Sequence, residues 1–287
     1  MKKYIKVASQ FGHEIMALNF AKALGLKVVI LPKKETEEEF TEESAQIYSN
    51  LSFFDVELLT VDFNERETYE AEAWDIIGDL RAGKLDKALW SKFAESQLTP
   101  QYTKTLPKYR GLRRKNCVLV IPQKLVSDGG CGVTAKQQSL PLEAFHFFLK
   151  NREIYPVLGQ HFHKENDLAD VKRLAEEYQI YVPGLGEYGH VLGIRGVNHE
   201  EFYHMYDSLE ASVGIAGTHT WLLLTMFPET PQIILYNKGT VEDWKALEAA
   251  YQELGYPIYC IGYDEETDMH ELTKQIESEY TQFCFRY

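Results

Sequence analysis

The stretch "VGIAGTHT", residues 213–220, places a small, hydroxyl-bearing turn between an apolar strand and an apolar helix. In open α/β sheets, ligands collect at the carboxyl ends of strands, where helix N-termini offer free N–H groups and a positive dipole end. Gly217 lets a ligand approach the backbone, Thr218 can cap the helix and donate its hydroxyl, and His219 can donate to a phosphate oxygen. We therefore expect these three residues, together with Thr220, to bind a phosphate-bearing ligand. The alternative is an ordinary capped helix that binds nothing.

A glycine-rich segment, "SDGGCGVT" at residues 127–134, follows another apolar strand. The backbone N–H groups of Gly129 and Gly130 can wrap phosphate oxygens, and Lys124 lies close by in the sequence. We expect this loop to share the phosphate-bearing ligand. A tight loop without a ligand would use the same glycines.

A second glycine-rich segment, "GLGEYGHVLGIRG" at residues 184–196, lacks the strand–turn–helix context of a dinucleotide-binding fingerprint. We interpret it as a loop over a substrate cleft. Arg195 in this loop is a candidate for contact with the substrate, and a loop without such a contact is the alternative.

The segments that must position these residues alternate between strand-like and helix-like patterns. In the first part of the chain, the helical spacing of residues 10–25 ends at Gly25, which can stop the helix. Such alternation predicts a parallel sheet with helices on both faces. The expected elements are strands at 4–9, 26–32 and 53–63, a helix at 10–25 and a helical pattern over 69–93.

The same alternation begins again after the basic run "KTLPKYRGLRRK", residues 104–115. Helical segments alternate with expected strands at 117–122, 154–160, 179–184, 213–215, 232–238 and 257–263, and a last helix is expected at 265–280. We expect an α/β protein of two Rossmann-like, doubly wound domains that face a cleft. Their ranges would be 1–115 and 116–287, and the last helix is a candidate to pack back on the first domain.

The composition of the 287-residue chain narrows the possible functions. The net charge of −13 argues against a general nucleic-acid binder. The four cysteines form no CxxC pair, which argues against a zinc site. No apolar run reaches the length of a membrane span and the N-terminus lacks a signal-peptide core, so we expect a cytoplasmic protein. The basic run 104–115 is either solvated surface or a contact with an anionic substrate or the inner face of a membrane.

The order of elements from "VLVIP" at residue 118 to "QIILYNK" at residue 238 resembles the donor-binding half of GT-B glycosyltransferases, most of all the heptosyltransferase-like group. The resemblance implies that residues 216–219 contact the diphosphate and sugar of a nucleotide-sugar donor. It also implies that Gln160, at the end of a strand, lies near the donor base. Ala216 stands where the family has an acidic residue.

The N-terminal stretch "VASQFGHEIMALNFAKAL" is similar to the acceptor side of the same family, with a strand, Gly12 and a helix. His13 stands where the family has the aspartate that acts as general base, and Glu14 follows it. Either side chain can accept a proton. The resemblance therefore implies catalytic roles for His13 or Glu14 and an acceptor-side role for Gly12 and Arg195.

The implied activity is transfer of a sugar from a nucleotide sugar to a hydroxyl group of a carbohydrate or lipid-linked acceptor, in polysaccharide or glycoconjugate synthesis. No cofactor is implied, and the absence of a DxD motif fits a metal-independent reaction. Two alternatives stay open: a polysaccharide pyruvyltransferase-like enzyme, with which "PQIILYNKG" is compatible, and a non-catalytic binding or partner protein of this fold, suggested by Ala216. A nicotinamide-dependent oxidoreductase is disfavoured because no strand is followed by GxGxxG.

Overall fold

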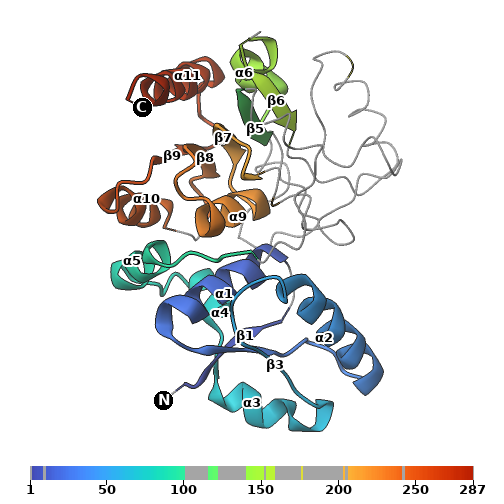
Figure 1. Ribbon diagram of the computed structural model, residues 1–287. Helices are drawn as coiled ribbons and strands as arrows, with labels where there is room; N and C mark the ends of the chain where they lie inside the picture. The colour runs from blue at the N-terminus through green and yellow to red at the C-terminus, as the bar shows by residue number, and fades with distance from the viewer. Residues whose placement is uncertain are drawn as a thin grey trace. The chain divides into compact units, whose positions relative to one another are not determined.

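The computed structural model describes residues 2–8, 11–100, 116–121, 140–151, 153–158, 176, 203, 206–240 and 243–286. These residues form two compact units, each with its own parallel β-sheet (Figure 1). Unit 1 comprises the described residues up to Pro100, together with Trp221–Phe227 and residues 243–254. Unit 2 comprises the remaining described residues.

Unit 1 is built on a four-stranded sheet in the order β3-β2-β1-β4. All of its described strand pairs are parallel, as connections through helices require. Gly25, with a φ of 63°, ends the first helix as the sequence indicates. The elements from the N-terminus are β1 (Tyr4–Val7), α1 (Phe11–Leu24), β2 (Lys27–Ile30), α2 (Glu37–Leu51), β3 (Leu58–Thr60), the 3-10 helix η1 (Phe63–Glu65), α3 (Arg66–Glu72), β4 (Ala73–Trp74), α4 (Ile76–Arg81) and α5 (Lys87–Glu95).

The first sheet is covered on both faces. On one face, Val29 packs with Phe40 of α2 and with Tyr69 of α3. The residues that alternate with Val29 along β2, Val28 and Ile30, are also fully buried. Since neighbouring side chains on a strand point to opposite faces, burial of all three requires helices on both sides.

The expectation of one helical pattern over residues 69–93 is wrong. The chain there forms the end of α3, the short strand β4, and the separate helices α4 and α5. Asp75 and Asp86 start these two helices by accepting hydrogen bonds from the N–H groups of Gly78 and Leu89. These capping aspartates favour new helix starts over a continuous helix. The difference matters because β4 completes the sheet beside β1.

Unit 2 is built on a five-stranded parallel sheet in the order β6-β5-β7-β8-β9. The predicted strand at 179–184 lies outside the described residues. The elements of this part of the chain are β5 (Cys117–Ile121), the 3-10 helix η4 (Leu142–Phe145), α6 (His146–Lys150), β6 (Tyr155–Leu158), β7 (Ala211–Ile215), α9 (Thr218–Met226), β8 (Gln232–Asn237), α10 (Trp244–Glu253), β9 (Ile258–Tyr263) and α11 (Met269–Arg286).

The core of unit 2 lies between its sheet and the helices α6 and α11, which Figure 1 shows together beside the strands. Val118 and Val213 of the strands belong to one buried cluster with Phe148 of α6 and Ile276 of α11. Leu119, which alternates with Val118 on β5, is buried as well. The sheet is therefore covered on both faces, and the expectation of two doubly wound, Rossmann-like α/β units is confirmed.

Unit 1 also contains an aromatic cluster to which late segments of the chain contribute. Trp221 of α9 stacks with Trp244 of α10, with ring centroids 4.9 Å apart, and meets Phe93 of α5 edge to face. The Tyr251 hydroxyl donates to the Leu224 carbonyl at 2.8 Å, which ties α10 to α9. Residues separated by more than 100 positions in the sequence therefore complete the core of unit 1.

Candidate functional site

The carboxyl ends of β1 and β4 mark the point where the strand order of unit 1 reverses. From β1 the chain proceeds outward through β2 and β3, and it then returns to β4 on the opposite side of β1. In open α/β sheets, the loops leave two such neighbouring strands in opposite directions and leave a crevice between them. A ligand site in unit 1 is therefore expected at this position.

A pocket lies at this reversal point, with a volume of about 120 Å³. Residues from four different parts of unit 1 surround it, and polar side chains outnumber apolar ones. From β1 and the turn after it come Lys6, Val7 and Ala8, from α1 His13 and Glu14, from the segment after β2 Lys33, and from the start and body of α4 Asp75, Ile77, Gly78 and Arg81.

His13 and Glu14 enter the pocket from the first turn of α1. The two residues differ in exposure: the His13 side chain is half-buried, whereas Glu14 is only 3% exposed. Gly12, between the strand and these residues, is buried. The structure thus brings both sequence-predicted proton acceptors to one pocket.

Arg81, at the end of α4, contacts His13 across the pocket. The Arg81 guanidinium nitrogen Nη2 lies 3.4 Å from Nδ1 of His13. A guanidinium group has hydrogen-bond donors and no acceptor, so Nδ1 is the acceptor in this contact. At 3.4 Å the contact is a long hydrogen bond.

Lys6, a residue of β1, also lines the pocket. Its position in the middle of β1 leaves the residue only 8% exposed, and its Nζ forms an ion pair with the Glu70 carboxylate of α3. A buried charge requires such a partner. Lys33, which follows β2, is exposed. The pocket therefore holds positive and negative groups side by side.

The start of α4 is fixed by local interactions that place Arg81 at the pocket. Asp75 accepts from the Gly78 N–H at 2.8 Å, and a Cβ atom at Gly78 would lie 2.9 Å from the Asp75 Cγ. The indole nitrogen of Trp74 donates to the Asp79 carboxylate at 2.7 Å. That hydrogen bond lowers the pKa of Asp79, with a smaller contribution from the nearby Lys84 ammonium.

The strand order of unit 2 also reverses, in this case between β5 and β7. Gly214 of β7 lies opposite Ile121, the last residue of β5, at the carboxyl ends of both strands. A Cβ atom at Gly214 would lie 2.4 Å from the Ile121 carbonyl oxygen, and the φ of Gly214 is 154°. Only glycine allows the two strands to approach so closely at this point.

Gly217 and Thr220 close the turn between β7 and α9. The helix begins at Thr218 itself, and the side-chain hydrogen bond at this end runs from the Gly217 N–H to Oγ1 of Thr220, at 3.2 Å. The expectation that Thr218 caps the helix is therefore wrong: Thr220 satisfies the exposed N–H group from inside the helix, as the third helical residue does in a capping box. Gly217 and Thr218 are half-buried, whereas Thr220 is buried.

His219 points into the interior of unit 2. It is 4% exposed, and its Nδ1 lies 2.5 Å from the hydroxyl of Tyr206. Burial keeps the pKa of Tyr206 well above its usual value, so the phenol stays neutral and can donate its hydrogen to the imidazole. Of the four residues predicted at this turn, Gly217 and Thr218 are thus the more accessible to a ligand.

The other predicted ligand-binding residues lie outside the described residues. They are Lys124, Gly129, Gly130, Gln160 and Arg195, and the basic run 104–115 lies outside as well.

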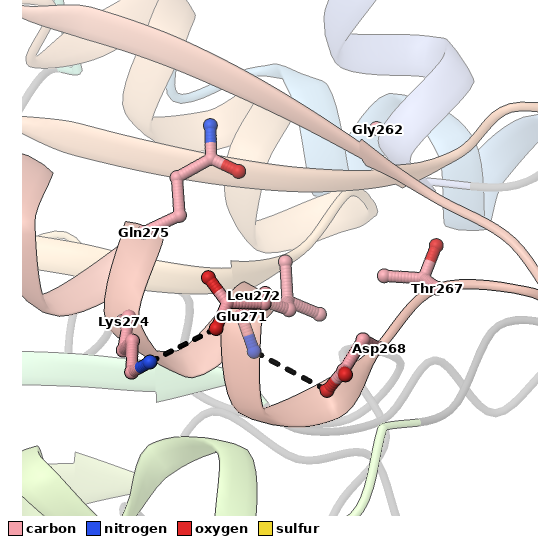
Figure 2. Close-up of a pocket in the computed structure, with 7 residues that line it drawn as sticks. All are labelled: Gly262, Thr267, Asp268, Glu271, Leu272, Lys274 and Gln275. Atoms are coloured by element: carbon pink, nitrogen blue, oxygen red, sulfur yellow. Dashed lines mark hydrogen bonds and ion pairs between the residues drawn. The ribbon is translucent and has the colours of Figure 1, made fainter.

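A wider pocket of about 400 Å³ lies in unit 2 between β9 and the start of α11. Figure 2 shows Lys274 paired with Glu271, at 2.9 Å, and Asp268 accepting from the Glu271 N–H. Thr267 also bonds to a neighbouring carboxylate, that of Asp264. These side chains form hydrogen bonds and an ion pair with one another in the turn before α11 and in its first turns, so we assign no chemistry to this pocket.

Sequence reasoning missed Lys6, Lys33, Asp75 and Arg81. Lys33 follows the strand predicted at 26–32, and the segment after a parallel strand is where binding residues gather. That signal was present in the sequence. Asp75, Arg81 and Lys6 carried none, because their place at the pocket depends on β4 and on the face of β1 that meets α3.

No helix within the described ranges is long and apolar enough to cross a membrane. In the same part of the chain, no three histidine, cysteine, aspartate or glutamate side chains are grouped so that they could hold a metal ion.

Comparisons with known proteins give one match. The chain is similar to a solved structure described as the glycosyl transferase family 9 protein from Veillonella parvula DSM 2008, at 12% sequence identity and a TM-score of 0.48. The match covers 96% of this chain and 88% of the other. No family model and no curated protein matches the sequence.

Proposed function

We propose that this protein is a glycosyltransferase that moves a sugar from a nucleotide-sugar donor to an acceptor hydroxyl group. The observation that carries the proposal is the pocket of unit 1, where the predicted proton acceptors His13 and Glu14 line the crevice expected to bind a ligand. A half-buried imidazole and a buried carboxylate at such a crevice are suited to general base catalysis.

Unit 2 is the proposed donor side. Its strands reverse at Gly214, and α9 starts directly beyond, so its first N–H groups and the Thr218 hydroxyl suit the oxygens of a diphosphate. We extend the donor site to Lys124 and the glycines at 129 and 130 because they belong to or lie near a glycine-rich segment after a strand, and to Gln160 because of the sequence resemblance. The buried His219 would support the turn rather than contact the ligand.

In the proposed reaction, the acceptor hydroxyl loses its proton to His13 or Glu14 while its oxygen forms a bond to the anomeric carbon of the sugar. The bond from that carbon to the diphosphate breaks, and the diphosphate leaves with the electron pair. Preorganised donors near the departing group lower the barrier most, and one such donor is worth on the order of 3 kcal/mol. We propose that backbone N–H groups and hydroxyls fill this role without a metal ion.

The proposed acceptor is a carbohydrate or a lipid-linked carbohydrate, as in polysaccharide or glycoconjugate synthesis in the cytoplasm. A docking role at the membrane for the run 104–115 is part of this proposal. Gly12 and Arg195 belong to the proposed acceptor side.

The donor proposal is tested by thermal unfolding of the full chain with a panel of nucleoside diphosphates and nucleotide sugars. A ligand that binds the native state at one hundred times its Kd stabilises it by about 2.7 kcal/mol. We expect one nucleoside diphosphate to raise the melting temperature, and Thr218→Val to remove that rise. Thr273→Val is the matched control, because Thr273 is a half-buried helical threonine of α11 whose hydroxyl bonds within its own helix.

Three other results would count against the proposal. A response to phosphoenolpyruvate alone would favour the pyruvyltransferase alternative. No response to any nucleotide would favour a non-catalytic binding protein. Loss of the response in Thr273→Val as well as in Thr218→Val would mean that the effect is a general loss of stability.

A further inference from the structure

The contact between Arg81 and His13 decides which of the two proposed proton acceptors takes the proton from the acceptor hydroxyl group. We infer that Arg81 positions His13 as a hydrogen-bond donor to the acceptor substrate, and that Glu14 is the group that takes the proton. This inference rests on the proposed function, since it assigns the roles of two residues in the same reaction.

The contact with Arg81 fixes which nitrogen of the His13 ring carries the hydrogen. Arg81 donates to Nδ1 of His13, so Nδ1 carries no hydrogen in this arrangement. A hydrogen on Nδ1 would place an N–H group against an N–H group of the guanidinium. The bond that one ring nitrogen makes fixes the tautomer of a neutral imidazole, so the ring hydrogen is on Nε2.

This tautomer makes the His13 ring a hydrogen-bond donor at Nε2. An imidazole nitrogen that carries a hydrogen donates and cannot accept a proton. The other nitrogen, Nδ1, is occupied by Arg81. His13 therefore offers the pocket an N–H donor, which can hold the acceptor oxygen in place.

Glu14 is the neighbouring residue in the pocket wall. It belongs to the first turn of α1 and is 3% exposed. An ionised carboxylate only accepts hydrogen bonds, and a bond from a hydroxyl to a carboxylate is strong where water is excluded. Glu14 is thus suited to take the acceptor proton as the new bond to the anomeric carbon forms.

The pocket is suited to one group of an acceptor rather than to a whole substrate. Its volume of about 120 Å³ is below the range of about 300–1,000 Å³ for pockets that enclose complete small molecules. A single hydroxyl-bearing end of the acceptor would meet the His13 donor and the Glu14 carboxylate together.

The tautomer is tested without turnover by NMR of the full chain labelled with ¹⁵N-histidine. The ring signals of His13 are assigned by their loss in His13→Gln. We expect the Nε2–H tautomer in the wild type, a mixture of tautomers in Arg81→Gln, and recovery of the wild-type signals in Arg81→Lys. The control is Lys84→Gln, which removes a neighbouring cation that pairs with Asp79 outside the pocket.

The division of roles is tested by the transfer rate, with the nucleotide sugar that the thermal panel identifies. A general base contributes about 10²- to 10⁴-fold to the rate. We expect Glu14→Gln to lower kcat by at least about 100-fold. His13→Gln keeps an amide N–H donor that cannot take a proton, so we expect a loss of less than about 10-fold in kcat, with a rise in KM.

The outcomes separate the inference from the proposed function. An Nδ1–H tautomer in the wild type, or a His13→Gln loss as large as that of Glu14→Gln, overturns the inference while transfer activity stands. Absence of any transfer by the wild type overturns the proposed function, and the NMR result still decides the role of Arg81. Because Glu14 is buried, its replacement could disturb folding. Glu14→Asp, which retains a carboxylate, is therefore compared with Glu14→Gln at matched melting temperature and far-UV circular dichroism.

Discussion

Replacement of Gly214 by alanine tests the close approach of β5 and β7 at the proposed donor site. The added Cβ atom would lie 2.4 Å from the Cβ atom and the carbonyl oxygen of Ile121 and 2.6 Å from its backbone nitrogen. Two of these atoms are backbone, so no side-chain rotation relieves the contact. Gly214 also has a φ of 154°, a conformation that residues with a side chain rarely adopt.

The expected cost has two parts. Overpacking in a well-packed core costs about 1–3 kcal/mol, and an unfavourable backbone conformation costs about 1–3 kcal/mol. The sum, about 2–6 kcal/mol, is a large part of the stability of a typical domain, about 5–15 kcal/mol. Because the clash involves backbone atoms of β5, which no side-chain rotation can move away, we expect a value in the upper half of that range.

The measurement is urea unfolding followed by circular dichroism, with Gly255→Ala as the matched control. Gly255 also belongs to unit 2 and has a φ of 85°, but a Cβ atom there would meet nothing within 4 Å. The control therefore carries a backbone cost, of about 1–2 kcal/mol, without the clash. At equal m-values, Gly214→Ala should be less stable than Gly255→Ala by at least about 1 kcal/mol. Equal stabilities of the two variants would refute the assignment of Gly214 to a strand contact.

Two further predictions concern side chains of unit 2. The Lys238 ammonium, 2.8 Å from the Asp264 carboxylate, and the Thr267 hydroxyl lower the pKa of Asp264. The ionised Asp264 therefore stabilises the fold at pH values above the usual aspartate pKa, and this contribution is lost as the pH falls through the lowered pKa. Lys238→Met should flatten the acid side of the stability profile measured by urea unfolding between pH 2 and pH 5, and an unchanged profile would contradict the assignment. Tyr206→Phe leaves Nδ1 of the buried His219 without its hydroxyl partner and should lower the free energy of unfolding by about 1–3 kcal/mol, whereas a neutral effect would show that the short contact contributes nothing.

Much of the fold was predictable from local patterns. The run "CVLVI" is buried at every position, as a continuous apolar strand in a parallel sheet must be. Gly25 ended α1 where the sequence indicates, because a left-handed residue stops a helix. The prediction of one helical pattern over 69–93 was wrong because the local signal was incomplete. The apolar residues of α3, α4 and α5 all follow helical spacing, and the two residues of β4 are too few to show a strand pattern between them.

The candidate site was predictable only in part. His13 and Glu14 stood out because they follow a strand, a glycine and a helix start. At the turn between β7 and α9, the sequence indicated His219 as a candidate but not the direction of its side chain. Helical periodicity does not reveal that the buried Tyr206 hydroxyl contacts this imidazole. The sequence gives the chemical group that a residue carries, whereas the exposure of that group depends on residues elsewhere in the chain.

The sequence by itself determined the alternation of strands and helices, and with it two parallel sheets whose strand ends carry glycines, hydroxyls and titratable groups. Those properties follow from local periodicity and from the connections that parallel strands need. Only the tertiary structure decided that β4 pairs with β1, and so that Arg81 reaches His13, 68 positions away. The tautomer of His13 depends on that contact, because a ring nitrogen takes its role from the group placed against it.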